Sequence, residues 1–289
     1  MNGILLIDKD AGWTSNDVVC KLKGILHERR VGHSGTLDPM ATGLLVVFVG
    51  RATRAVEFAE RDEKRYHASL RLGLTTDTQD ITGNILETKP VLIEREELEK
   101  TLTRFAGEQL QIPPMYSAVR VGGKRLYDIA RKGGEVERKA RPVTIRELRL
   151  LGREGEDWLL DVRCSKGTYI RTLCHDIGQS LGCGGCMSAL RRIEAGGFSV
   201  EDAVGIEEMQ RLHDEGRVEE RLLPVDSLFS RETACVALPE EEKRIRCGNN
   251  YPTGLASGVY RVYNESGAFL MLGRAEAGSM TTIKNFFEV

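Results

Sequence analysis

The sequence predicts a mixed α/β fold followed by a small β module toward the carboxyl terminus. Residues 65–73 alternate polar and apolar side chains with the period of a half-buried strand. Residues 94–106 instead place apolar side chains at the spacing of one helical face. After about residue 230 the chain changes character, because short β-like runs are separated by glycines. We therefore expect one domain over residues 1–230 and a small β domain over 231–289.

The first elements in chain order are strands joined by one helix. A short apolar run at 3–7 predicts a buried strand, and a turn then leads to a helix that begins near Ser15. The run LLVVFV at 44–49 predicts the next strand. Residues 65–73 are expected to form another, whose apolar face holds Tyr66, Ala68, Leu70 and Leu72.

The following elements continue this mixture. The helix at 94–106 is expected to pack on the sheet, and residues 158–164 predict a further strand. Another helix is expected from Ile170 to Gly182, where glycine ends it. The stretch 201–222 holds eight acids against three arginines and suggests an exposed helix. Three later runs indicate the β module: GVYRVYN, AFLMLG and TTIKNFF.

Composition excludes several classes of protein. A hydrophobic content of 41% with a net charge of −2 lies outside the disordered regime. The longest apolar run, LLVVFV, is far shorter than the roughly 20 residues of a membrane-spanning helix. The amino terminus lacks the basic and apolar regions of an export signal. We expect a cytoplasmic protein without a membrane segment.

The cysteines suggest reduced thiols. There are seven of them, an odd number, and they are scattered along the chain. Cys183 and Cys186 form a Cys-x-x-Cys, but the sequence offers no second pair of the kind that a structural zinc site needs. We expect no metal.

One segment of this nearly neutral chain is strongly basic. Residues 120–146 contain nine lysines or arginines against three acids, interleaved with glycines and a tyrosine. A solvated surface is the ordinary reading of such a segment. A flexible loop that closes on a phosphate backbone is the alternative.

The stretch VGHSGTLDPMATGLL at 31–45 holds a single charged residue, Asp38, among many turn-forming residues. Gly32, Gly35 and Gly43 permit tight or positive-φ conformations, and the proline after Asp38 disfavours a helical aspartate. The carboxylate is therefore expected on a shaped loop.

Together with four other stretches, this loop resembles the bacterial tRNA pseudouridine-55 synthases, the TruB family. The stretches are KRYHASLRLGLTTDTQDITG, PPMYSAVRVGGKRLYDIARKG, CSKGTYIRTLCHDIG and SALRRIEAGGF. The resemblance covers about residues 1–200 in order and is weaker toward the carboxyl terminus. It implies the pseudouridine synthase fold, a long, largely antiparallel sheet flanked by helices. It also makes a PUA-like domain the candidate for residues 231–289.

The resemblance implies three catalytic residues. Asp38 matches the catalytic aspartate, which acts as nucleophile or base on the ribose of the target uridine. Arg171, in TYIRT, matches the arginine that pairs with it, and a guanidinium can hold a carboxylate ionised in bidentate geometry. Tyr66 matches the tyrosine that stacks on the target base and is a candidate for moving the C5 proton. Taken alone, the three could be an Asp-Pro turn, an ordinary ion pair and a core aromatic.

The resemblance also implies residues that bind the substrate. Asp80 matches a second carboxylate of the ion-pair network, although a turn acid is a close alternative. Tyr169 and Leu190 match walls of the uridine pocket and could equally be core residues. His33 matches a histidine that contacts the nucleic acid where the flipped base leaves a gap. The expected basic contacts are Lys64, Lys124 and Arg125, with Arg191 and Arg192 as further candidates.

The implied function is conversion of uridine to pseudouridine at position 55 in the T-loop of tRNA. The nucleotide is flipped out of the loop, the C–N glycosidic bond breaks with the help of the aspartate, and the base rejoins through C5. The expected partner is the T-arm stem-loop, bound by a monomer that uses no cofactor. The basic segment at 120–146 would clamp the RNA, and assistance to tRNA folding is a secondary possibility.

Three rival functions fit the sequence less well. An RNA-remodelling protein without chemistry would not need Asp38, Tyr66 and Arg171. A zinc-dependent base deaminase built on Cys183 and Cys186 would need a His-x-Glu and a proline before the first cysteine, which this sequence lacks. A small-molecule phosphate enzyme would leave the basic segment unexplained.

Overall fold

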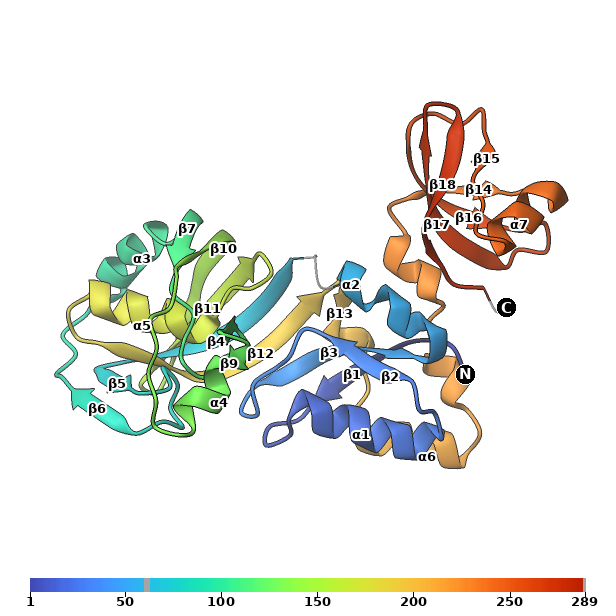
Figure 1. Ribbon diagram of the computed structural model, residues 1–289. Coiled ribbons are helices and arrows are strands. Elements are labelled where there is room, and N and C mark those ends of the chain that lie inside the picture. The colour runs from blue at the N-terminus through green and yellow to red at the C-terminus, as the bar shows by residue number, and fades with distance from the viewer. Residues whose placement is uncertain (60–62, 288–289) are drawn as a thin grey trace.

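The computed structural model describes residues 1–59 and 63–287, and its central feature is one long sheet (Figure 1). In the described residues this sheet has nine strands, in the order β1-β3-β12-β4-β11-β10-β7, with β2 paired to β3 and β13 to β12. The strands are β1 (Gly3–Lys9), β2 (Val31–Ser34), β3 (Thr42–Val49), β4 (Lys64–Leu72), β7 (Gly107–Gln111), β10 (Arg141–Glu154), β11 (Asp157–Cys164), β12 (Gly185–Ala195) and β13 (Phe198–Ser199).

The sheet is largely antiparallel, as expected, and is joined at its middle by a short parallel contact. β12 and β3 pair in parallel through Arg191 opposite Thr42 and Arg192 opposite Gly43. Gly43 has φ 96°, and a Cβ there would lie 2.3 Å from the carbonyl oxygen of Arg192, so only glycine allows the two strands to meet. The chain segment before β3 therefore lies at the junction of the two halves of the sheet.

Helices cover each half separately. On one half, α3 (Arg95–Thr103) and α5 (Ile170–Ser180) pack against a core that contains the apolar residues of β4, β11 and β12. On the other, α1 (Ser15–Leu26) and α6 (Ile206–Asp214) pack against β1 and β3. The remaining helical elements of this region are η1 (Gly50–Ala55), α2 (Val56–Ala59), η2 (Val200–Asp202), η3 (Val218–Arg221) and η4 (Val225–Phe229).

Local sequence explains where the first helix and the alternating strand form. The Thr14 hydroxyl accepts from the backbone of Asp17 while the Asp17 carboxylate accepts from the backbone of Thr14, a capping box that begins α1. In β4 the burial alternates residue by residue, and Tyr66, Ala68, Leu70 and Leu72 face the core as predicted.

The acidic stretch at 201–222 is not one exposed helix. It forms η2, α6 and η3, and α6 buries Ile206, Met209 and Leu212, the first two in the core that α1 covers. These three residues repeat at helical spacing, so the acids occupy only the outer face of an amphipathic helix. The prediction of exposure was wrong because the charge count hid this apolar face.

The basic segment is partly regular structure. Residues 120–125 form a hairpin of β8 (Arg120–Val121) and β9 (Lys124–Arg125), whose turn glycines have φ 57° and 82°. The helix α4 (Leu126–Ala130) follows, and its Leu126 is fully buried. Residues 141–146 belong to β10, so the loop character expected for 120–146 ends at residue 140. A second small hairpin pairs β5 (Leu74–Thr76) with β6 (Ile85–Thr88).

The carboxyl-terminal residues form a five-stranded sheet in the order β14-β16-β17-β18-β15. Its strands are β14 (Thr233–Val236), β15 (Tyr251–Pro252), β16 (Gly258–Tyr263), β17 (Phe269–Glu276) and β18 (Ser279–Asn285). The helix α7 (Pro239–Arg246) packs on this sheet, so the module is not all β. Aromatic contacts join the module to η4, where Phe229 meets Phe269 and Phe286.

Candidate active site

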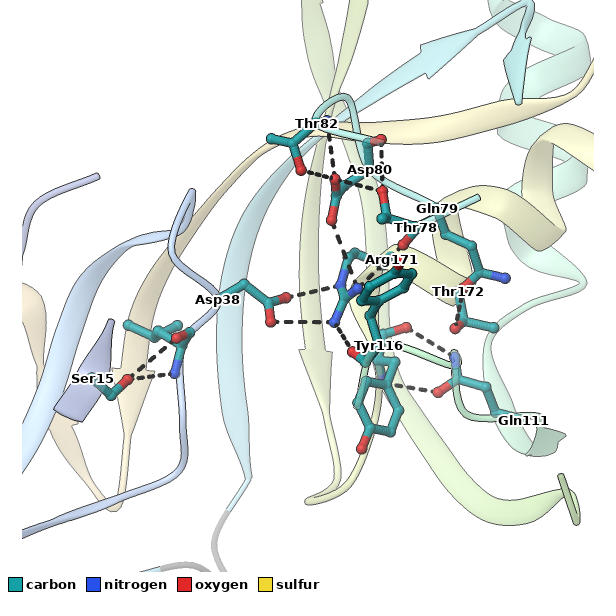
Figure 2. A network of polar contacts seen from close by, with 12 residues as sticks. Ser15, Asp38, Thr78, Gln79, Asp80, Thr82, Gln111, Tyr116, Arg171 and Thr172 are labelled. Carbon is teal, nitrogen blue, oxygen red and sulfur yellow. Dashed lines mark hydrogen bonds and ion pairs between the residues drawn. The ribbon is translucent and has the colours of Figure 1, made fainter. Parts of the chain in front are cut away.

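The Asp38 carboxylate faces the Arg171 guanidinium across the junction of the two sheet halves (Figure 2). Arg171 Nε lies 2.9 Å from Asp38 Oδ2, and Arg171 Nη2 donates to Asp38 Oδ1 at 3.2 Å. Asp38 lies on the loop between β2 and β3, whereas Arg171 lies in the first turn of α5. This two-point geometry fixes both side chains, as a planar guanidinium and a carboxylate allow. The sequence predicted this pair.

Arg171 is held on every side by oxygen atoms. Its Nη1 donates to the Thr78 carbonyl at 3.2 Å and lies 3.7 Å from Asp80 Oδ2. Its Nη2 also donates to the Tyr116 carbonyl at 2.8 Å. The Arg171 side chain is only 6% exposed, whereas that of Asp38 is 35% exposed. The arginine is therefore buried, whereas the Asp38 carboxylate that it holds stays accessible to a substrate.

Asp80 is the buried second carboxylate of this network. The hydroxyls of Thr78 and Thr82 donate to Asp80 Oδ1 at 2.8 and 2.6 Å, and the Thr82 backbone N–H does so at 3.0 Å. Backbone hydrogen bonds between Gln79, Ile81 and Met187 attach this turn to β12. Asp80 thus combines the turn role and the ion-pair role that the sequence left as alternatives.

Burial and the charge of Arg171 act in opposite directions on the pKa of Asp38. Desolvation raises the pKa of the Asp38 carboxyl, and the charge of Asp80 raises it further. The Arg171 guanidinium opposes both by its charge and its hydrogen bond, and Lys9 adds a smaller opposing effect. The ionised form of Asp38 consequently depends on Arg171 remaining in place.

Buried side chains anchor the loop that carries Asp38 by hydrogen bonds to its backbone. The Ser15 hydroxyl accepts from the Leu37 backbone N–H at 2.9 Å and donates to the Leu37 carbonyl at 3.3 Å. Lys9 Nζ donates to the carbonyls of Trp13 at 2.7 Å and Pro39 at 3.4 Å. Arg192 donates to the Gly35 carbonyl at 3.0 Å. These contacts fix the residues on both sides of Asp38.

Lys9 and Arg192 are functional-site residues that the sequence reasoning missed or misplaced. Both side chains are fully buried, and Arg192 donates to the Leu44 carbonyl as well as to Gly35. Burial lowers the pKa of Lys9, and the charges of Asp10 and, to a smaller extent, Asp38 oppose this. Because buried cations need compensating partners, these backbone carbonyls supply part of what water would otherwise provide. No local pattern distinguishes them from ordinary surface cations.

The expected RNA contact of Arg192 is wrong, whereas that of Arg191 stays a prediction. Arg192 is enclosed within the protein. Arg191 forms two hydrogen bonds to the Asp8 carboxylate, at 3.0 and 2.7 Å. The register of β12 places both residues at its contact with β3, but the Arg191 side chain is 41% exposed there.

Tyr66 and Leu190 lie on the buried side of the junction. Tyr66 is 7% exposed, and in the strand register it is opposite Arg192 while Leu190 is opposite Ala68. Burial raises the pKa of the Tyr66 phenol, whereas the Arg192 guanidinium lowers it by charge and hydrogen bonding. The Asp38 charge adds a smaller effect that also raises the pKa of this phenol.

Of the other predicted residues, three are buried or half-buried and two are exposed. His33 on β2 is half-buried, and burial lowers its pKa, while Lys64 on β4 is buried and approaches Gly35. Tyr169 is half-buried and directly precedes α5. Lys124 and Arg125 are instead exposed on the β8–β9 hairpin. The structure thus joins Asp38, Asp80 and Arg171 directly, whereas the two hairpin cations are exposed to solvent.

The cysteines do not form a recognisable metal site. All seven are free, and Cys183 and Cys186 are buried. Within residues 1–59 and 63–287 no group of three or more potential metal ligands comes together. In the same residues no helix is long and apolar enough to cross a membrane.

Comparison with known proteins identifies the family to which this site belongs. Residues 23–170 match the TruB family pseudouridylate synthase amino-terminal domain, and residues 171–230 match the tRNA pseudouridylate synthase B carboxyl-terminal domain. The chain belongs to the TruB family of pseudouridine synthases. The family predicted from the sequence is confirmed, and the chain is an isomerase of this class.

Relatives support this membership over nearly the whole chain. The tRNA pseudouridine synthase B of Dechloromonas aromatica is 42% identical and covers 100% of this chain and 96% of its own length. That of Clostridium kluyveri is 39% identical over 99% and 100%, and that of Alkaliphilus oremlandii is 45% identical over 86% and 82%.

Solved structures support the fold. A crystal structure of a Cbf5-Nop10-Gar1 complex matches with a TM-score of 0.74 at 24% identity, covering 99% of this chain and 85% of that one. A structure of an H/ACA RNP bound to a substrate RNA containing 2'-deoxyuridine matches at 0.73 and 22% identity, with coverage of 99% and 85%. The predicted mixed α/β synthase fold is confirmed.

Proposed function

We propose that this chain converts uridine 55 in the T-loop of tRNA to pseudouridine. The observation that carries the proposal is the Asp38–Arg171 pair, in which a reachable carboxylate is held by a buried guanidinium. The name shared by the curated relatives, tRNA pseudouridine synthase B, supports tRNA as the substrate. The choice of the T-arm rests on the sequence resemblance.

The proposed reaction moves a bond within one nucleotide. The N1–C1′ bond of the uridine breaks, the base turns, and a C5–C1′ bond forms. The proton on C5 then leaves, and N1 gains a proton, so that the product has the composition of the substrate. Asp38 acts on the ribose as nucleophile or base, and Arg171 keeps it ionised.

Pocket residues receive the extruded base in this proposal. Flipping a nucleotide out of a folded loop costs on the order of a few kcal/mol. Stacking on Tyr66 would return about 1–3 kcal/mol, with Tyr169 and Leu190 as neighbouring walls. Tyr66 is also the candidate for moving the C5 proton, and burial raises the pKa of its phenol. His33 would contact the RNA at the place that the base leaves.

The remaining binding free energy would come from phosphate contacts. Lys124 and Arg125 project from an exposed hairpin, as a clamp on a charged backbone requires. We place Lys64 among the RNA contacts because it lies beside the catalytic loop at Gly35. The proposed catalytic domain spans 1–230 with this clamp as an insertion, and the proposed PUA-like domain spans 231–289. A cytoplasmic monomer remains our expectation.

The test is site-specific detection of the product. Purified protein is incubated with an unmodified tRNA transcript without added metal, nucleotide or reductant. Pseudouridine is then mapped by carbodiimide adducts and primer extension. A single stop that reports pseudouridine at position 55, one nucleotide to its 3′ side, is expected. Binding without product at any position would instead favour the RNA-folding function, and product elsewhere would overturn the T-loop assignment.

A further inference from the structure

Gln111 is a buried polar residue outside the catalytic network described above. It is the last residue of β7, the strand at one end of the long sheet, and it is 4% exposed. Its Oε1 accepts from the Tyr169 backbone N–H at 2.8 Å, and its Nε2 donates to the Tyr169 carbonyl at 3.0 Å. Figure 2 shows this pair of bonds beside Arg171. One amide thus satisfies both polar groups of one residue.

Tyr169 is the residue from which α5 begins. It is the N-cap, and its own side chain makes no capping hydrogen bond. The first turn of a helix is held weakly unless other groups fix it, since its backbone N–H groups have no partner within the helix. Arg171 lies in this turn, so the two bonds from Gln111 set the position from which its side chain starts.

The chain after Gln111 also returns to Arg171. Five residues later, the Tyr116 carbonyl accepts from Arg171 Nη2 at 2.8 Å. Gln111 therefore anchors the start of the helix that carries the guanidinium, and the chain that leaves Gln111 supplies a carbonyl to the same guanidinium. The segment that follows leads into the β8–β9 hairpin.

We infer that Gln111 is a positioning residue that places Arg171 against Asp38. This inference rests on the proposed function for its kinetic consequence, although the geometry can be tested without RNA. The buried amide has one orientation that satisfies both bonds, and a shift of about 1 Å in a positioned group can lower a rate about 100-fold. Methionine has a similar length but cannot make either bond.

The first experiment measures the Asp38 carboxyl in the free protein. Carbon-13 NMR titration is carried out on wild type, Gln111→Met and Gln109→Met, with Asp38→Asn to assign the signal. Gln109 is a matched control, because it lies on the same strand and donates to the Phe105 carbonyl at 2.8 Å, away from α5. Gln111→Met should raise the pKa of Asp38 because Arg171 opposes its protonation less well, and Gln109→Met should not. An unchanged Asp38 titration in Gln111→Met would overturn the inference.

The second experiment measures pseudouridine formation as a function of pH. Gln111→Met should lower kcat roughly 10- to 100-fold, with little change in KM and with the acid limb moved to higher pH. A residue that only stabilised the fold would lower the active fraction and leave the acid limb where it is. If Gln111→Met does not fold, Gln111→Asn tests the same point, because its amide is too short to span both bonds. An inactive wild type would contradict the proposed function, while the NMR titration would still decide the role of Gln111.

Discussion

The charged residues at the centre of the sheet and those on the basic hairpin differ in how they are held. Arg171 is buried and donates to Asp38, Thr78 and Tyr116. Lys124 and Arg125 lie on an exposed two-residue strand. Held charges act over short distances in a site of low dielectric, whereas exposed charges are screened by salt. The first group is therefore suited to chemistry and the second to affinity.

The largest effect should come from removing the charge of Asp38. Asp38→Asn keeps the shape of the side chain but cannot serve as nucleophile or base. We expect the turnover of tRNA to fall at least about 1,000-fold, with tRNA affinity changed only a few-fold. Product is measured by chromatography of the digested nucleosides and affinity by filter binding. Loss of binding together with product would mean that Asp38 acts in the structure of the loop.

Removing Arg171 should have the next largest effect. Arg171→Met leaves Asp38 with burial and the charge of Asp80, both of which raise its pKa. The protonated form then persists to higher pH, so the acid limb of the rate profile should move upward as kcat falls about 100-fold. Single-turnover rates between about pH 5 and pH 9 measure both changes. A lower rate with an unmoved acid limb would separate Arg171 from the ionisation of Asp38.

A held ion pair away from the site should affect stability without affecting chemistry. Arg65 donates to both oxygens of Asp161 at 2.8 Å, and this bonding lowers the pKa of the Asp161 carboxyl. Since the folded-state pKa is depressed, the pair stabilises the protein above the unfolded-state pKa and loses this effect as pH falls through the folded value. Asp161→Asn should lower the free energy of unfolding by about 1–3 kcal/mol at pH 7 and by less in acid. Urea unfolding at both pH values checks this, and an equal loss at both would contradict the charge argument.

The smallest effect should come from the exposed hairpin. Reversing the charge of both Lys124 and Arg125 should weaken tRNA binding about 10-fold and flatten its salt dependence by about two or more units of slope. The matched control reverses Lys21 and Lys23, which are exposed on α1. Binding measured from low to moderate salt gives the slope. If the hairpin variant keeps the wild-type slope, the clamp is not where the phosphates bind.

The predictability of these two regions also differs. Asp38, Arg171 and Tyr66 were singled out because the motifs they stand in resemble those of the family, whereas the strand pattern of Tyr66 predicted only that it faces the core. Lys9 and Arg192 could not be found in this way, since burial of a cation depends on carbonyls that tertiary structure brings to it. Gln111 carried no signal either, because its partner, Tyr169, is distant in sequence.

The fold shows the same division between local and distant determinants. β4 and α1 were predicted from local periodicity and capping. β10 was not recognised as a strand, because its charged residues were counted with the basic segment that precedes it. The helical spacing of Ile206, Met209 and Leu212 was present in the sequence, and the surrounding acids obscured it. Helix α7 was missed because only one of its residues, Ile245, is buried, so the helix has no apolar face to recognise in the sequence.

The most direct measurement of the central claim is single-turnover tritium release from a tRNA labelled at C5 of uridine 55. Wild type and Asp38→Asn are compared at concentrations that give equal amounts of bound tRNA. We expect complete release by wild type and none above background by Asp38→Asn. Release by the variant at a rate near that of wild type would show that a carboxylate at this position is not required, and would contradict the account.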